Sequence, residues 1–190
     1  IRKEQIQIEA VKKHLKQTFT PYEQELLQYF YLCIAYDGSK FLVLLIFFSF
    51  FHVGREFCME ILFLLSLRNF FGGLHFNHYA SCFAFTFAFS STGLMLSHCI
   101  VLCNNLQTAL LAVMIMISAL IKPVPSADRP PLSAKQNFIY KFCGMIVLFI
   151  YFAFFLTTQT FPYRNLCFWV IVLQTLQLTT AKFMKGEKRP

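Results

Sequence analysis

Charged residues are scarce in this sequence, making up only 14% of its 190 residues. A water-soluble domain is about a quarter charged. None lies between Arg68 and Lys122, a stretch long enough for two bilayer spans of about 20 residues each. These features exclude a soluble globular domain and predict an integral membrane protein. The 17 Lys and Arg outnumber the 9 Asp and Glu but lie between apolar runs, so no basic face for nucleic acid is expected.

The chain also lacks an even set of cysteines and an internal repeat. Its seven cysteines form an odd number and lie mostly inside apolar runs, so we interpret them as mainly free thiols. The absence of a repeat argues against a transporter with inverted halves.

Six apolar runs predict an all-α, polytopic membrane protein with about six transmembrane or re-entrant helices. The first two runs are short for a full span, and charged Arg55, Glu56 and Glu60 between and within them are expected to be solvated or paired. The runs cover residues 41–54, 57–71, 79–97, 106–121, 142–158 and 166–181.

The N-terminal part has a different, amphipathic pattern. Apolar residues recur at helical spacing over residues 2–19 among several lysines, which predicts a helix that lies in the membrane surface or packs on the domain. Thr20 can cap a second helix that begins near Pro21 and ends at Tyr36, before Asp37 and Gly38. We therefore expect N-terminal amphipathic or interfacial helices over 1–36, a helical membrane domain over 37–182 and a basic tail over 183–190.

The basic residues predict the orientation in the membrane. The polar connection over residues 122–141 and the C-terminal tail are both rich in Lys and Arg, whereas Ser97–Asn105 has neither. By the positive-inside rule the connection and both termini are cytoplasmic, and Ser97–Asn105 is external.

Polar residues gather in one short stretch between the second and third runs. His75 and Cys82 can form a base and a nucleophile, and Gly72 and Gly73 can support an oxyanion or a tight turn. Seven residues along one helix rise about 10 Å, too far for a hydrogen bond. Residues 72–76 must therefore form a loop or re-entrant turn if His75 is to reach Cys82.

The pattern Leu67-Arg68-x-Phe70-x-Gly72-Gly73-x-His75, followed seven residues later by Cys82, resembles the signature of the accessory gene regulator protein B family, AgrB. The similarity extends from the amphipathic N-terminus to the last apolar run. It includes a basic, proline-containing loop over residues 122–132, in which Pro130-Pro131 stands where the family pattern has a single proline.

The resemblance implies a membrane cysteine endopeptidase of bacterial quorum sensing in the cell membrane. Such an enzyme cuts off the C-terminal part of a short, AgrD-like pro-peptide and closes a thiolactone or lactone ring. It implies His75 and Cys82 as the catalytic pair, no cofactor and a homodimer. The substrate would bind to Arg68, unless that side chain only reaches the lipid headgroups, and an acidic peptide segment would dock on Lys122, Arg129 and Lys135.

Two other classes of function stay open. A non-enzymatic transporter or channel subunit explains the apolar runs but not the polar turn. A metal or haem protein could use His75, His78 and Cys82, or His98, Cys99 and Cys103, but neither group has an evident fourth ligand for zinc. We therefore expect no metal.

Overall fold

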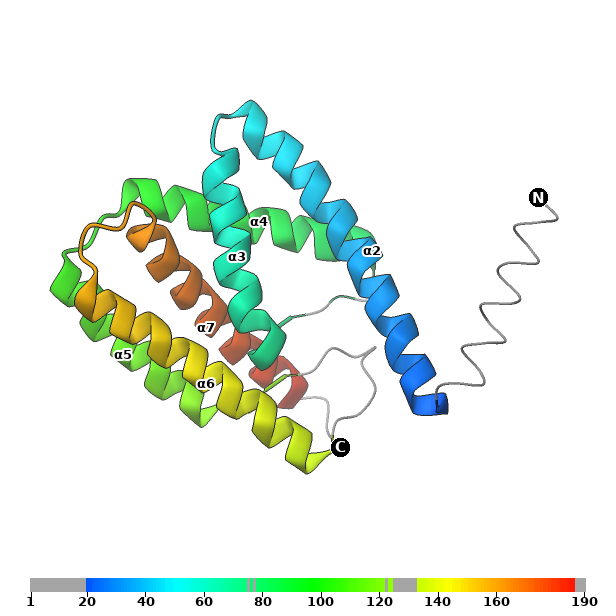
Figure 1. The fold of residues 1–190 in the computed structure, drawn as a ribbon. Helices are drawn as coiled ribbons and strands as arrows, with labels where there is room; N and C mark the ends of the chain where they lie inside the picture. The colour runs from blue at the N-terminus through cyan, green and yellow to red at the C-terminus, as the bar shows by residue number, and fades with distance from the viewer. Residues whose placement is uncertain (1–19, 75, 77, 122, 125–132, 187–190) are drawn as a thin grey trace.

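A computed structural model of the chain describes residues 20–74, 76, 78–121, 123–124 and 133–186. Regular structure in this part is helical, so the predicted all-α class is confirmed (Figure 1). The amphipathic helix predicted over 2–19 lies outside the described residues. The helices are α2 (Pro21–Phe50), α3 (Gly54–Phe71), α4 (Tyr79–Cys99), α5 (Asn104–Leu120), α6 (Ala134–Thr157) and α7 (Arg164–Gly186).

The start of α2 is the predicted one, but its end is not. The Thr20 hydroxyl accepts from the Glu23 amide, and the Glu23 carboxylate accepts from the Thr20 amide. This capping box gives a partner to two backbone N–H groups at the helix start. The helix then continues through Asp37 and Gly38 to Phe50, so the predicted end at Tyr36 is wrong. One glycine costs a helix only about 1 kcal/mol relative to alanine, and Asp37 binds a side chain of the same helix, Lys40.

Four helices are long and apolar enough to cross a membrane. They are α2 from residue 23 to 50, α4, α6, and α7 from residue 164 to 183; α5 is apolar but shorter. Each of the six predicted runs lies mainly in one helix, although length and composition give four candidate spans rather than six in the described part of the chain. Exposed apolar side chains on these helices, such as Phe50 and Leu120, are suited to contact with lipid.

The helix α3 carries an ionisable side chain, Glu60, into the protein interior. Glu60 is completely buried, so the expectation that it is solvated or paired is wrong: neither carboxylate oxygen has a hydrogen-bond partner. It faces α4 at Gly93, where a β-carbon would lie 2.4 Å from Glu60 Oε1. Glycine therefore makes room for this side chain.

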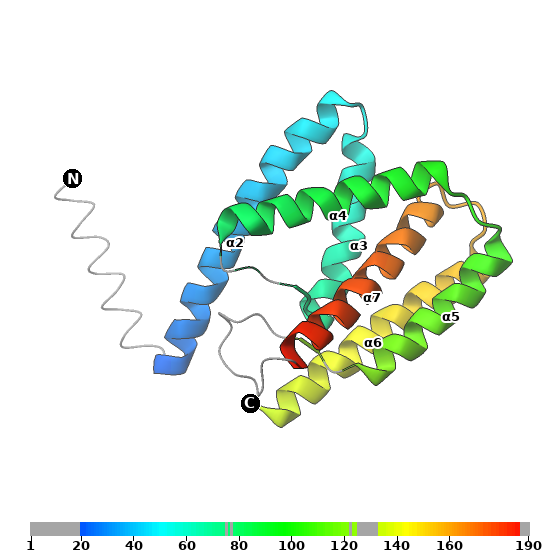
Figure 2. The same ribbon diagram turned by 180° about the vertical axis from the view of Figure 1, so that it is seen from behind.

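The helix α7 is central in the bundle and packs against α3, α4 and α5 (Figures 1 and 2). Its residues Leu166, Phe168 and Val170 are almost fully buried. One apolar core joins α7 to α3, α5 and α6, and a second joins it to α2, α3 and α4. Because lipid tails are as apolar as these side chains, close van der Waals packing within the two cores, rather than removal of apolar area from water, stabilises the contacts between the helices. Side chains of α7 also bond the turn after α3, through Gln174, and the end of α4, through Asn165 and Trp169.

Candidate functional site

The turn after α3 is built around Gly72. The amide of Gly72 donates to the carbonyl of Arg68 (2.8 Å), which ends the helix, and Gly72 has a φ of 75°, a conformation that favours glycine. The described residues between Phe71 and Tyr79 are non-helical. The prediction that the helix breaks at the diglycine is therefore confirmed.

A second segment of the chain closes against this turn. Gly72 and Val124 form a parallel β-bridge, and the Val124 amide donates to the Phe71 carbonyl (2.9 Å). The start of the predicted basic loop therefore lies beside the diglycine turn. Residues more than 50 positions apart in the sequence are brought together here.

The helix α7 supports the same turn from the protein interior. The side-chain amide of Gln174 donates to the Gly72 carbonyl (2.8 Å). Gln177 is buried against Gly73, where a β-carbon would lie 2.8 Å from its Nε2 atom. Because the Gly72 amide and carbonyl both have partners, these contacts favour turn support over an oxyanion role for Gly72.

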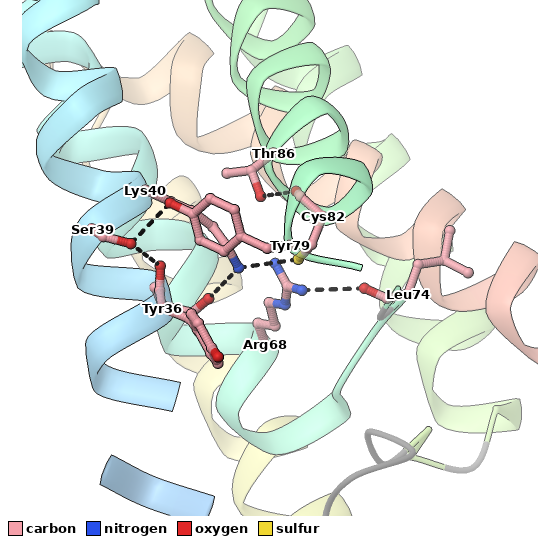
Figure 3. A network of polar contacts seen from close by, with 9 residues as sticks. Tyr36, Ser39, Lys40, Arg68, Leu74, Tyr79, Cys82 and Thr86 are labelled. Carbon is pink, nitrogen blue, oxygen red and sulfur yellow. Dashed lines mark hydrogen bonds and ion pairs between the residues drawn. The ribbon is translucent and has the colours of Figure 1, made fainter. Parts of the chain in front are cut away.

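Arg68 joins the end of α3 to the same turn. Its side chain is half-buried and donates from Nη2 to the Leu74 carbonyl (3.2 Å) (Figure 3). A guanidinium has five N–H donors, so this contact leaves donors for an additional acceptor such as a carboxylate. The predicted substrate-binding residue is therefore also a structural residue of the turn that contains His75.

Cys82 lies in the first turns of α4 and is 8% exposed. Its amide donates to the His78 carbonyl (3.1 Å), and its own carbonyl accepts from the Thr86 hydroxyl (2.9 Å). These bonds fix the backbone that carries the thiol. The thiol therefore lies close to the N-terminus of a helix, a position that reactive cysteines often occupy.

A lysine that the sequence analysis did not single out contacts this thiol. Lys40 of α2 is only 6% exposed, and its Nζ atom lies 3.2 Å from Cys82 Sγ (Figure 3). The same ammonium is 2.9 Å from the Asp37 carboxylate and 5.5 Å from the centre of the Tyr79 ring. The Tyr79 hydroxyl bonds the Ser39 hydroxyl (2.9 Å), so α2 and α4 are tied together by polar contacts at this point.

The signal for Lys40 was present in the sequence. A lysine stands three residues after Asp37, immediately before an apolar run, and charged residues next to such runs are functional candidates. Interpreting Asp37 and Gly38 as a helix end placed Lys40 in a turn rather than inside a helix.

The other predicted site residues are placed only in part. His75, Lys122 and Arg129 lie outside the described residues. Lys135 is exposed in the first turn of α6. The structure thus brings together Arg68, Gly72 and Gly73 at one turn, and Cys82 with Lys40 beside it.

Metal ligands do not gather in the part of the chain that the structure describes. No group of three or more His, Cys, Asp or Glu side chains there could hold a metal ion. Cys99 and Cys103 are exposed free thiols, and His98 is also exposed. The candidate cluster of His78, Cys82 and His75 extends outside the described residues.

Comparisons with known proteins agree with the sequence pattern. A family model described as Accessory gene regulator B matches residues 6–178. This range includes α2 to α6, most of α7 and the polar turn. Searches among curated proteins and solved structures gave no match. The long apolar helices and this match indicate a membrane protein with a pro-peptide substrate. The chain therefore belongs to the accessory gene regulator B family, which acts in the processing of quorum-sensing peptides.

Proposed function

We propose that the protein is a membrane cysteine endopeptidase, with Cys82 as the nucleophile and His75 as its base. The observation that carries this proposal is the position of the Cys82 sulfur. It lies near the N-terminus of α4, beside an ammonium group (3.2 Å) and seven positions after His75 in the sequence. Such an electropositive setting is typical of reactive cysteines, whereas a structural buried cysteine has apolar neighbours.

The reaction then follows the usual course of thiol proteases. The imidazole of His75 takes the thiol proton, and the Cys82 sulfur attacks a backbone carbonyl carbon of the pro-peptide. The new C–S bond forms as the carbonyl oxygen takes up negative charge. When the intermediate collapses, the C–N bond breaks and the departing amine takes the proton from the imidazolium. The product is an acyl-enzyme thioester and a released C-terminal fragment.

The second half of the reaction closes the peptide ring. A cysteine thiol, or a serine hydroxyl, within the bound peptide attacks the thioester carbon, and Cys82 leaves as a thiol after regaining a proton. His75 takes the proton of the attacking thiol or hydroxyl and returns it to the Cys82 sulfur as the bond from that sulfur to the acyl carbon breaks, which gives a cyclic thiolactone or lactone. The tethered group has a high effective concentration, and an apolar site at the membrane edge excludes water. Cyclisation therefore outcompetes hydrolysis.

The substrate binds through basic residues near this site. The acidic C-terminal part of the pro-peptide docks on Lys122, Arg129 and Lys135, and the Arg68 guanidinium anchors a carboxylate. The contact of Gly72 with Val124 supports this arrangement, because it places the start of the basic segment at the turn. The enzyme acts as a homodimer in the bilayer, with the turn and the basic segment on the cytoplasmic side.

The test is processing of a pro-peptide by the purified Cys82→Ala variant. We expect no cleavage, because no other group can form the thioester. Cys143→Ala is the matched control: Cys143 is a half-buried free thiol on α6, and its replacement should leave cleavage unchanged. Cleavage at the normal rate by Cys82→Ala would refute the proposed function.

A further inference from the structure

Lys40 is a buried cation without a buried anion to neutralise it. The lysine is 6% exposed, but the Asp37 side chain on the same helix is 65% exposed. An ion pair with a solvated carboxylate contributes little to stability, whereas placing an ammonium among membrane helices is costly. Stability therefore does not explain a lysine at this position.

The ammonium of Lys40 donates a hydrogen bond to the sulfur of Cys82. Nζ and Sγ are 3.2 Å apart, and the contact joins α2 to α4 across 42 residues of sequence. The Tyr79 ring lies on another side of the ammonium, and its hydroxyl is held by Ser39. The lysine is thus oriented from three directions, with one N–H aimed at the thiol (Figure 3).

We propose that Lys40 is a third catalytic residue, whose ammonium holds the sulfur of Cys82 as a thiolate ready for attack. This inference rests on the proposed function. A positive charge 3.2 Å from the sulfur strongly favours the anion, because the surrounding medium is less polar than water.

The lysine acts by its charge and stays protonated throughout the reaction. The thiol proton goes to His75, not to Lys40, and later leaves with the amine of the released fragment. When the C–S bond forms, the sulfur loses its negative charge and the ammonium keeps the Asp37 carboxylate as its partner (2.9 Å). Asp37 thus explains how Lys40 remains charged in both the free enzyme and the acyl-enzyme.

Charged and titratable groups near the sulfur come from α2, from the end of α3 and from the start of α4. Lys40 and Asp37 come from α2, and Arg68 comes from the end of α3, where it binds the Leu74 carbonyl. Tyr79 and His78 belong to the start of α4, and His75 precedes them in the turn. Among the described residues, Lys40 is the cation with a direct contact to the sulfur.

The test is the rate at which iodoacetamide alkylates Cys82 at pH 7 in the full-length protein in detergent. Mass spectrometry reads Cys82 separately from Cys99 and Cys103, which are exposed and serve as internal controls. In Lys40→Met the rate at Cys82 should fall about tenfold or more, because the thiol returns to its neutral form. The rates at the two control cysteines should not change. Raising the pH should restore the rate.

Lys40→Arg separates charge from proton transfer. Arginine keeps the positive charge but does not release a proton in proteins, so we expect most of the alkylation rate and of pro-peptide cleavage to remain. Loss of cleavage in Lys40→Arg with a normal alkylation rate would show that Lys40 acts as a base and would overturn the inference. An unchanged alkylation rate in Lys40→Met would overturn it as well.

The alkylation test requires that Lys40→Met folds. Methionine has nearly the same length as lysine and removes a charge from an apolar helix, so Lys40→Met should fold, and continued protection of the buried thiol of Cys167 from alkylation reports that it does. The wild-type protein offers a second measurement, the ultraviolet absorbance of a thiolate at pH 7 that Cys82→Ala lacks. A neutral thiol there would also refute the role of Lys40. The proposed function fails separately, through normal cleavage by Cys82→Ala.

Discussion

The carbonyl oxygen of Val124 occupies the space that a side chain at Gly72 would need. A β-carbon at position 72 would lie 2.0 Å from this oxygen, and the φ of 75° is itself unfavourable for other residues. The β-bridge between the two residues holds the segment before α6 against the turn after α3. Glycine is therefore required at this position for packing as well as for conformation.

Replacing Gly72 with alanine should separate these two segments. We expect a loss of about 2 kcal/mol or more in the free energy of unfolding, from backbone strain and overpacking. Pro-peptide cleavage should fall more steeply, because the turn that carries His75 shifts. Thermal unfolding and cleavage assays measure the two effects.

The control for this variant is Gly38→Ala in α2. Nothing lies within 4 Å of a β-carbon at Gly38, so alanine there should stabilise the helix by up to about 1 kcal/mol. Equal behaviour of the two variants would contradict the importance of the contact with Val124.

The sequence predicted the helices and the turn because both depend on local features. Apolar runs mark each helix, and the adjacent glycines mark the break after Phe71. The end of α2 was predicted wrongly because Asp37 and Gly38 are typical of turns, whereas the contact between Asp37 and Lys40 becomes visible only once the helix is formed.

The same contrast between local and long-range features holds for the proposed nucleophile and its surroundings. Cys82 follows from its spacing to His75 and from the family pattern. Lys40 stands beside an apolar run, which is a local signal, but its contact with Cys82 has none, because the two residues are 42 positions apart and no local pattern records which faces of α2 and α4 meet. Glu60 also escaped prediction, because its burial depends on the glycine at position 93 of another helix.

Arg164, the buried arginine at the start of α7, should stabilise the fold. Arg164 is 4% exposed and donates to the Gln107 side chain (3.1 Å) and to the carbonyls of Phe155 (2.9 Å) and Thr158. Arg164→Met would leave these acceptors without a partner, at a cost of about 2–4 kcal/mol. Its thermal unfolding midpoint should fall clearly.

The exposed arginine at the start of α3 provides a matched control. Arg55→Met should change the free energy of unfolding by no more than about 0.5 kcal/mol, because Arg55 is exposed. Below the unfolding temperature, Arg164→Met should still cleave the pro-peptide, since Arg164 is the first residue of α7 and lies about 15 Å along the helix from Gln174, which contacts the diglycine turn. Equal unfolding midpoints for the two variants would show that the Arg164 network contributes little.

The orientation of the chain can be tested with cysteines that it already contains. Cys99 and Cys103 are exposed at the turn between α4 and α5, which the positive-inside rule places outside the cell. A membrane-impermeant maleimide added to intact cells should label both.

A cysteine introduced at Ser133, which is exposed just before α6, should react only after the cells are opened. The bridge from Gly72 to Val124 puts the diglycine turn on the same side as this segment, which we expect to be the cytoplasmic side, where a newly made pro-peptide is available. Labelling of Ser133→Cys in intact cells, with Cys99 and Cys103 protected, would reverse the orientation and place the Cys82 site on the external side.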